Sequence, residues 1–194
     1  MRLFVALDIN DEIRCRIARF LEGVCGFAPE VRWVRPESLH VTLKFIGEKS
    51  AEKAEEIERA LRTISAETID IAFRGYGFFP NARAPRLFWI GVEAGSKLAW
   101  LAAAVDKSLT ALEVPPEGHS FNAHLTLARG GTRSHARKGG PRREEASFQH
   151  LQAKLGALPP PEFGTMTARE FFLYQSQTLP SGSRYTKLAS FSLH

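Results

Sequence analysis

The sequence carries one four-residue pattern twice, at two distant places in the chain. The copies are His40-Val-Thr-Leu43 and His124-Leu-Thr-Leu127. Each lies in a segment that alternates like a half-buried strand, and side chains on a strand point alternately to opposite faces. The histidine and threonine of each copy therefore share one face, while the apolar residues anchor the other face in the core. If the two halves of the chain face each other, both pairs converge on one cleft.

Two imidazoles in one cleft could perform acid–base chemistry at phosphorus. In-line displacement needs one group to take a proton from the nucleophile and another to give a proton to the leaving oxygen. Histidine titrates near neutrality, and each such transfer is worth about 10²–10⁴-fold in rate. The hydroxyls of Thr42 and Thr126 could donate hydrogen bonds to phosphate oxygens. We therefore predict catalysis by His40 and His124, with no metal and no cofactor.

Other interpretations of these residue types are weaker. A single half-buried histidine on a strand is more often structural than catalytic, but the repetition favours catalysis. Zinc binding lacks a third ligand at a repeated spacing. Cys15 and Cys25 are too few for a disulfide framework, and we expect two buried or half-buried thiols. The remaining histidines are unduplicated and are interpreted as surface or structural residues: His119, His135, His150 and His194.

Hydrophobic periodicity predicts the elements that must position the two motifs. Helices are expected at 11–24, 51–64, 97–112 and 144–155, and strands at 2–8, 39–46, 69–79, 87–92, 121–128, 167–175 and 185–193. Several strands follow one another directly, which favours an α+β fold. We predict a bilobal arrangement of pseudo-twofold duplicated sheets, with helices on the outer side and a central cleft. Residues 1–194 should form a single domain of two interleaved lobes, each contributing one motif strand.

Charge and composition restrict the partners. Apolar residues make up 44% of the chain and charged residues 24%, as in ordinary soluble proteins. No apolar run is long enough for a membrane span, and the start does not resemble a signal peptide, so we expect a cytoplasmic protein. The net charge of +5 is concentrated in the basic loop, residues 129–143. Such a cluster suits a polyanionic partner, although a solvated loop has the same composition.

The motifs and their surroundings resemble the two-histidine phosphoesterase superfamily. Within it they resemble the LigT group, the RNA 2′,3′-cyclic phosphodiesterases, also called 2′-5′ RNA ligases. The similarity extends over nearly the whole chain, and the matching segments include Arg2–Leu7, Leu39–Gly47, Phe121–Arg129 and Leu173–Ser176.

This resemblance implies a bilobal α+β fold with the motif strands lining the cleft. It implies hydrolysis of RNA 2′,3′-cyclic phosphate ends to 2′-phosphates, with ATP-independent 2′-5′ ligation as a further activity. His40 would be the proton donor to the leaving 3′-oxygen, and His124 the proton acceptor that activates water. Arg129 matches a position linked to phosphate binding. The expected partners are RNAs with 2′,3′-cyclic phosphate or 2′-5′ ends, tRNA fragments among them, and the expected state is a monomer.

Two basic residues near the motifs allow two interpretations each. Arg129 lies an odd number of residues after His124, so a regular strand would point it away from the cleft. It can reach phosphate only past the strand end or beyond a bulge, and otherwise it is a surface arginine. Lys44 shares the His40 face by alternation, where it could attract phosphate or simply be solvated.

Other candidates have structural alternatives that we favour. Trp33, Phe79 and Trp89 could stack on a nucleobase, but core packing is the preferred interpretation. Tyr174 and Ser176 could border the cleft, or belong to a purely structural strand.

Two other functions remain open at this point. The same chemistry would suit a small-molecule phosphodiesterase acting on a cyclic nucleotide or an ADP-ribose-derived cyclic phosphate. A non-catalytic RNA-binding module would keep the cleft without turnover. The basic loop favours RNA, and two intact histidines favour catalysis, because binding alone needs no pair of proton-transfer groups.

Overall fold

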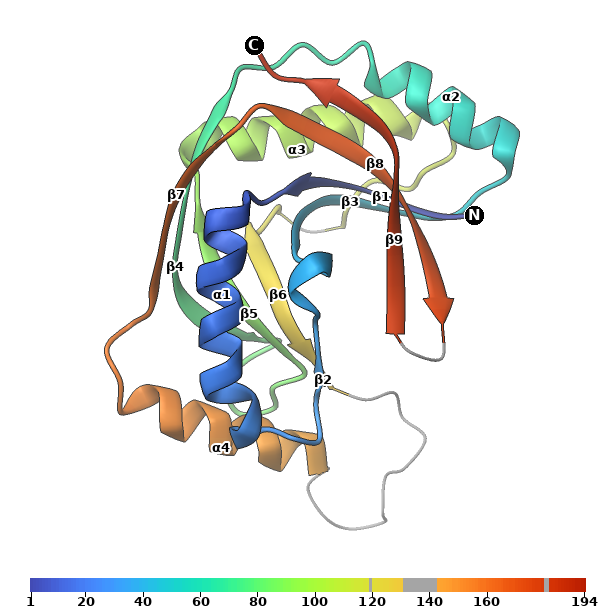
Figure 1. Ribbon diagram of the computed structural model, residues 1–194. Helices are drawn as coiled ribbons and strands as arrows, with labels where there is room; N and C mark the ends of the chain where they lie inside the picture. Colours follow the sequence, from blue (N-terminus) through green and yellow to red (C-terminus); the bar gives the residue numbers. More distant parts are fainter. Residues whose placement is uncertain (119, 131–142, 180–181) are drawn as a thin grey trace.

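The computed structural model describes residues 1–118, 120–130, 143–179 and 182–194 (Figure 1). Its helices are α1 (Asp11–Val24), α2 (Ala51–Leu61), α3 (Gly95–Thr110) and α4 (Arg143–Gly156), with 3₁₀ turns η1 (Cys25–Phe27) and η2 (Pro36–Ser38). Its strands are β1 (Arg2–Asp8), β2 (Arg32–Trp33), β3 (His40–Glu48), β4 (Ile69–Phe79), β5 (Leu87–Glu93), β6 (His124–Arg129), β7 (Glu162–Ala168), β8 (Glu170–Leu179) and β9 (Gly182–Ser192). The predicted role of residues 131–142 of the basic loop lies outside the described residues.

The described strands form one curved sheet in which every pairing is antiparallel. The order is β7-β4-β5-β6-β3-β1-β8-β9, and β2 pairs with β6. Counted outward from the centre, β6-β5-β4-β7 on one side corresponds to β3-β1-β8-β9 on the other. The strand order therefore confirms the predicted α+β class with a pseudo-twofold duplication.

The helices cover the outside of the curved sheet and cross between its halves (Figure 1). Helix α1 follows β1 but packs against β7, in the other half of the sheet, whereas α3 follows β5 but packs against β3. Helices α2 and α3 pack on each other, and α4 contacts the turn η1 that ends α1. No helix in the described ranges is long and apolar enough to span a membrane.

Helix α1 shows how local sequence specifies an element. The side chain of Asn10 accepts a hydrogen bond from the backbone N–H of Ile13 at 2.9 Å and so caps the first turn. Ile13 and Ile17 belong to the buried stripe that faces the core. Cys15, between them, points away from that stripe. Both Cys15 and Cys25 are free and exposed, so the prediction of buried or half-buried thiols was wrong.

Two strands were not predicted: the two-residue strand β2, and β7. The sequence indicated a single strand from residue 167, whereas the chain forms β7 before it and starts β8 at Glu170. Among the described strands, β7 pairs with β4 alone, at the edge of the sheet, and few of its side chains are buried. Its apolar pattern is weak because an edge strand with one open face buries few apolar side chains.

Candidate active site

The two motif strands are direct neighbours at the centre of the sheet. Strands β3 and β6 pair antiparallel through Val41 and Leu125, both fully buried on the helix side. This register places His40 opposite Thr126 and brings His124 to the diagonal position from His40. The Cα atoms of diagonal neighbours on antiparallel strands lie roughly 7–8 Å apart, and their Cβ atoms somewhat closer. Two imidazoles at this spacing can each form a hydrogen bond to the same phosphate group. The four predicted side chains thus share one concave face.

Both imidazoles are held by the same device. Nδ1 of His40 lies 2.8 Å from the carbonyl oxygen of Ser38, and Nδ1 of His124 lies 2.8 Å from the carbonyl oxygen of Asn122. A carbonyl oxygen can only accept, so each Nδ1 carries a proton and donates it. The nitrogen that exchanges protons in each ring is therefore Nε2.

Aromatic side chains from neighbouring strands enclose His40. The ring of Phe4 in β1 lies 4.9 Å from the imidazole, and the ring of Tyr185 in β9 meets it edge-on at 5.1 Å. Tyr174 in β8 stacks on Phe4 at 5.0 Å, and its own ring centre is 6.3 Å from His40. Tyr174 therefore borders the site. Phe4 and Tyr185 were not predicted as site residues from the sequence, because a lone aromatic on a strand has no distinguishing pattern.

A second aromatic pair encloses His124. Phe79 meets its ring edge-on at 5.1 Å, and the indole of Trp89 lies 6.3 Å away. The indole lies over Gly77, where an added Cβ would be 2.2 Å from Trp89 Cζ2. The preferred prediction of core packing was therefore wrong for Phe79 and Trp89. It was right for Trp33, which packs edge-on against a buried phenylalanine and donates its indole N–H to a backbone carbonyl.

A β-bulge brings Arg129 to the cleft. The register of β6 against β5 shifts by one residue at Leu127, so Leu127 and Ala128 are both buried on the helix side. Arg129 then returns to the face of His124, and its charge lowers the pKa of both histidines. The bulge that a phosphate-binding role required is present.

The same bulge occurs in β3, with a different result. The register of β3 against β1 shifts at Leu43, which turns Lys44 to the helix side. Lys44 is 2% exposed and forms an ion pair with Asp106 at 2.6 Å, so both predictions for it, on the His40 face or solvated, were wrong. Phe45 then occupies the position that corresponds to Arg129, and it is 58% exposed. The two halves of the site therefore differ at this position, with Arg129 in one half and Phe45 in the other.

The surroundings of the histidines favour their neutral forms in the ligand-free protein. Burial lowers the pKa of His40 to about 4, against the opposing influence of the Ser38 carbonyl and the Asp8 carboxylate. Burial also lowers the pKa of His124. The positive charge of Arg129 acts in the same direction on both rings. An anionic ligand in the cleft would reverse part of this effect and favour a charged imidazole.

The carboxylate beside His40 is itself held in place. Asp8 opposes His40 across the β1–β3 ladder, and it bonds to Arg14 at 2.7 Å and to Lys187 at 2.6 Å. Burial alone would raise the pKa of Asp8, but Lys187 and Arg14 outweigh it and hold the pKa below its usual range. Asp8 is therefore a negatively charged group near one of the two histidines at neutral pH.

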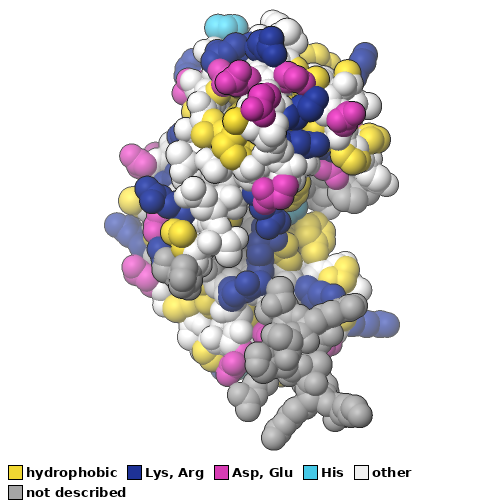
Figure 2. Space-filling model, turned by 90° about the vertical axis from the view of Figure 1, so that its right-hand side faces the viewer, with side chains coloured by type: hydrophobic (Ala, Val, Ile, Leu, Met, Phe, Trp, Pro, Cys, Tyr) yellow, Lys and Arg dark blue, Asp and Glu magenta, His cyan; other side chains and the backbone are white. Residues whose placement is uncertain are grey.

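Further arginines add positive charge near the histidine pair. Desolvation, followed by repulsion from Arg32 and Arg2, lowers the pKa of Arg129 against the influence of Tyr185. Arg32 also donates a hydrogen bond to the carbonyl of Gly130 at 3.2 Å. Figure 2 shows Lys and Arg side chains as a band beside a hollow in which a histidine is visible. Such a surface attracts anionic ligands.

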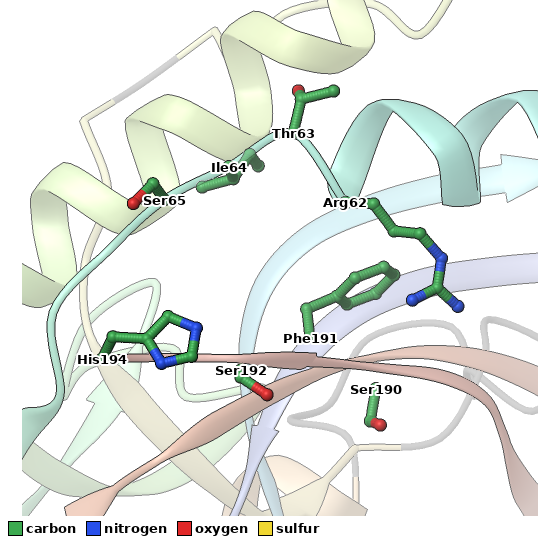
Figure 3. A pocket seen from close by; sticks show the side chains of 8 residues that line it. All are labelled: Arg62, Thr63, Ile64, Ser65, Ser190, Phe191, Ser192 and His194. Atoms are coloured by element: carbon green, nitrogen blue, oxygen red, sulfur yellow. The ribbon is translucent and has the colours of Figure 1, made fainter.

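A separate pocket of about 410 Å³ lies between the end of α2 and the end of β9 (Figure 3). Arg62 lies over the ring of Phe191 at 5.5 Å and already pairs with Glu58 at 2.5 Å. His194 also lines this pocket. None of the catalytic or phosphate-binding residues predicted from the sequence does, so we place the candidate site at the motif strands.

Comparisons with known proteins agree with the sequence resemblance. The family model described as LigT like Phosphoesterase matches residues 7–89. The RNA 2′,3′-cyclic phosphodiesterase of Archaeoglobus fulgidus is 36% identical over 191 residues, which cover 98% of this chain and 99% of the relative. That of Methanothermobacter thermautotrophicus is 31% identical over 195 residues, covering 100% and 99%.

A solved structure supports the same relationship at the level of the fold. The crystal structure of Escherichia coli LigT complexed with 3′-AMP is 27% identical and has a TM-score of 0.77. The match covers 99% of this chain and 97% of the LigT chain. The duplicated motif, the full-length similarity and the shared architecture therefore lead to one conclusion: this chain belongs to the LigT-like phosphoesterase family.

Proposed function

We propose that this chain is an RNA 2′,3′-cyclic phosphodiesterase that opens cyclic phosphate ends to 2′-phosphates with His40 and His124. The observation that carries the proposal is the pairing of β3 with β6, which makes the two imidazoles diagonal neighbours on one concave face. Each ring has Nδ1 engaged by a carbonyl, which leaves Nε2 for proton exchange. The curated relatives named RNA 2′,3′-cyclic phosphodiesterase support the choice of substrate.

His124 and His40 account for both proton transfers of the proposed reaction. Nε2 of His124 accepts a proton from water as the water oxygen forms a bond to phosphorus. The bond between phosphorus and the 3′-oxygen breaks on the opposite side, and His40 gives that oxygen the proton held on Nε2. The product is a 2′-phosphate and a free 3′-hydroxyl. Attack by a ribose hydroxyl of a second RNA in place of water would give 2′-5′ ligation without ATP.

The proposed direction of proton transfer, with His40 as donor, is supported by Asp8. Its carboxylate favours the charged form of His40, whereas no carboxylate contributes to the pKa of His124 within the part of the chain that is described. In the free protein burial outweighs Asp8, so the anionic phosphodiester must supply the remaining stabilisation of the charged His40. His124, neutral in the free protein, is suited to accept the proton from water.

The charge that develops on the phosphate oxygens requires donors on the same face. Thr42 and Thr126 lie there beside the histidines, and Arg129 reaches it through the bulge in β6. We propose that these three residues bind the non-bridging oxygens. Arg2 and Arg32 add positive potential for an RNA chain. A cytoplasmic location, a monomeric state and tRNA fragments as substrates stay predictions.

The decisive experiment uses an oligoribonucleotide that ends in a 2′,3′-cyclic phosphate, incubated in EDTA. We expect a 2′-phosphate product, and losses of at least about 10²–10⁴-fold in kcat for His40→Ala and His124→Ala. His150→Ala removes an exposed histidine of α4 and is the matched control. Full activity in either motif variant would contradict the catalytic assignment, and loss of activity in EDTA would indicate a metal enzyme.

The same assay separates the competing substrates. A cyclic mononucleotide and an ADP-ribose-derived cyclic phosphate are compared with the oligonucleotide at equal concentration. A higher kcat/KM for either small molecule would replace RNA with that substrate class, while binding without turnover of any of them would indicate a non-catalytic module.

A further inference from the structure

Lys44 is the one buried charged side chain among the described residues. A charge taken out of water is costly unless ion pairs and hydrogen bonds replace its hydration, so a lysine at this position requires such partners. The bulge at Leu43 turns Lys44 to the helix side, and the equivalent bulge in β6 turns Ala128 to the same side. A small apolar residue thus fills the corresponding position in one half of the protein. The lysine in the other half requires a separate explanation.

The partners of Lys44 come from two other segments. Its Nζ lies 2.6 Å from Oδ1 of Asp106 in α3, 2.6 Å from the carbonyl oxygen of Pro115 and 3.4 Å from Oε1 of Glu117. Oδ1 of Asp106 also accepts a hydrogen bond from the backbone N–H of Glu117 at 3.2 Å. Lys44 therefore joins β3, α3 and the connection that follows α3 at one point.

This connection leads into the second motif. It carries Asn122, whose carbonyl oxygen lies 2.8 Å from Nδ1 of His124. A shift of the connection would move the acceptor that keeps the His124 proton on Nδ1. We infer that Lys44 is a positioning residue, which acts with Asp106 to hold the connection so that the Asn122 carbonyl orients the His124 ring. The inference rests on the proposed role of His124 as the base.

The test is the double variant Lys44→Met with Asp106→Asn, which removes the buried charge together with the carboxylate nearest to it. Glu117, the other carboxylate near Lys44, is 37% exposed and stays hydrated after both changes. Nitrogen-15 NMR of the histidine side chains reports which ring nitrogen carries the proton, without any need for turnover. We expect a mixture of tautomers at His124 and an unchanged His40 spectrum. The value of kcat/KM for the cyclic-phosphate oligonucleotide should fall about 10- to 100-fold.

Two further variants keep the test decisive. Lys49→Met is the matched control, because Lys49 bonds at 3.2 Å to the carbonyl of Glu113 on the same connection but does so near the surface. It should change neither ring. Asp106→Asn alone should give a smaller change at His124 in the same direction, and it serves if the double variant does not fold.

The possible outcomes are distinct. An unchanged His124 tautomer in a folded variant would overturn the inference, and so would equal changes in both rings, which would mean a general loosening of the site. If the wild-type protein opens no cyclic phosphate, the proposed function fails, yet the tautomer measurement still decides the role of Lys44.

Discussion

Acidification should remove a stabilising contribution that comes from His40. Burial lowers the pKa of its imidazole to about 4 in the folded protein, against an ordinary value of 6.5. The folded protein therefore binds fewer protons at this site than the unfolded chain, and a falling pH favours unfolding. The contribution is fully present above pH 6.5, declines between 6.5 and about 4, and is absent below that range.

The size of this contribution follows from the two pKa values. The interval from 6.5 to about 4, taken at about 1.36 kcal/mol per pH unit, corresponds to about 3 kcal/mol. His40 retains some contact with solvent, so we expect about 2–3 kcal/mol after screening. His40→Gln removes the titration and keeps a polar side chain. As the pH falls from about 7.5 to about 4, the unfolding free energy of the wild type should decrease by this amount relative to that of the variant.

Urea unfolding of both proteins across this range, followed by tryptophan fluorescence, measures the difference directly. Other titrating groups affect both proteins and cancel. His124→Gln should show a change of the same sign, because burial lowers the pKa of His124 as well. Parallel stability curves for wild type and His40→Gln would refute the reasoning, since they would mean that the ring is as easily protonated in the folded protein as in the unfolded chain.

Four further substitutions test other parts of the site by steady-state kinetics. Gly77→Ala places a Cβ 2.2 Å from the indole of Trp89 and must displace that ring. We expect kcat to fall by about tenfold or more. An unchanged kcat would mean that the position of the indole is unimportant. Thr42→Val and Thr126→Val remove one hydroxyl each at nearly constant shape, and should lower kcat by about 10²–10³-fold with little change in KM. Arg129→Gln removes a charge that lowers the pKa of both histidines. The acidic limb of the pH profile of kcat/KM should therefore move to higher pH, and inorganic phosphate should inhibit less. An unmoved limb would mean that the charge of Arg129 does not act on the histidines.

Local sequence patterns were sufficient where the determining contacts are local. The prediction for α1 agrees with the observed bounds because the Asn10 cap directly precedes the helix and the apolar stripe lies within it. Strict alternation identified the motif strands and the shared face of His40 and Thr42, since neighbouring side chains on a strand diverge whatever lies around them. The resemblance to the LigT group was likewise recognised from the two motifs and the segments around them.

The bulges show where such reasoning fails. Simple alternation puts Lys44 on the face of His40 and Arg129 on the face opposite to His124, and the structure reverses both. A bulge is a mismatch between two paired strands, so its position depends on the partner strand as well as on the bulged one. For the same reason β7 escaped prediction, because β4 provides its hydrogen bonds while its own apolar pattern is weak.

The sequence by itself determined which side chains are available for chemistry: a duplicated histidine–threonine pair on strands, in a chain with excess positive charge. The tertiary structure alone decided how they meet. It paired Val41 with Leu125, turned Arg129 into the cleft, and surrounded each imidazole with rings from distant strands. The physical reason is that strand pairing and burial join residues far apart in the chain, and it is these contacts that set the spacing and the pKa values of the two histidines.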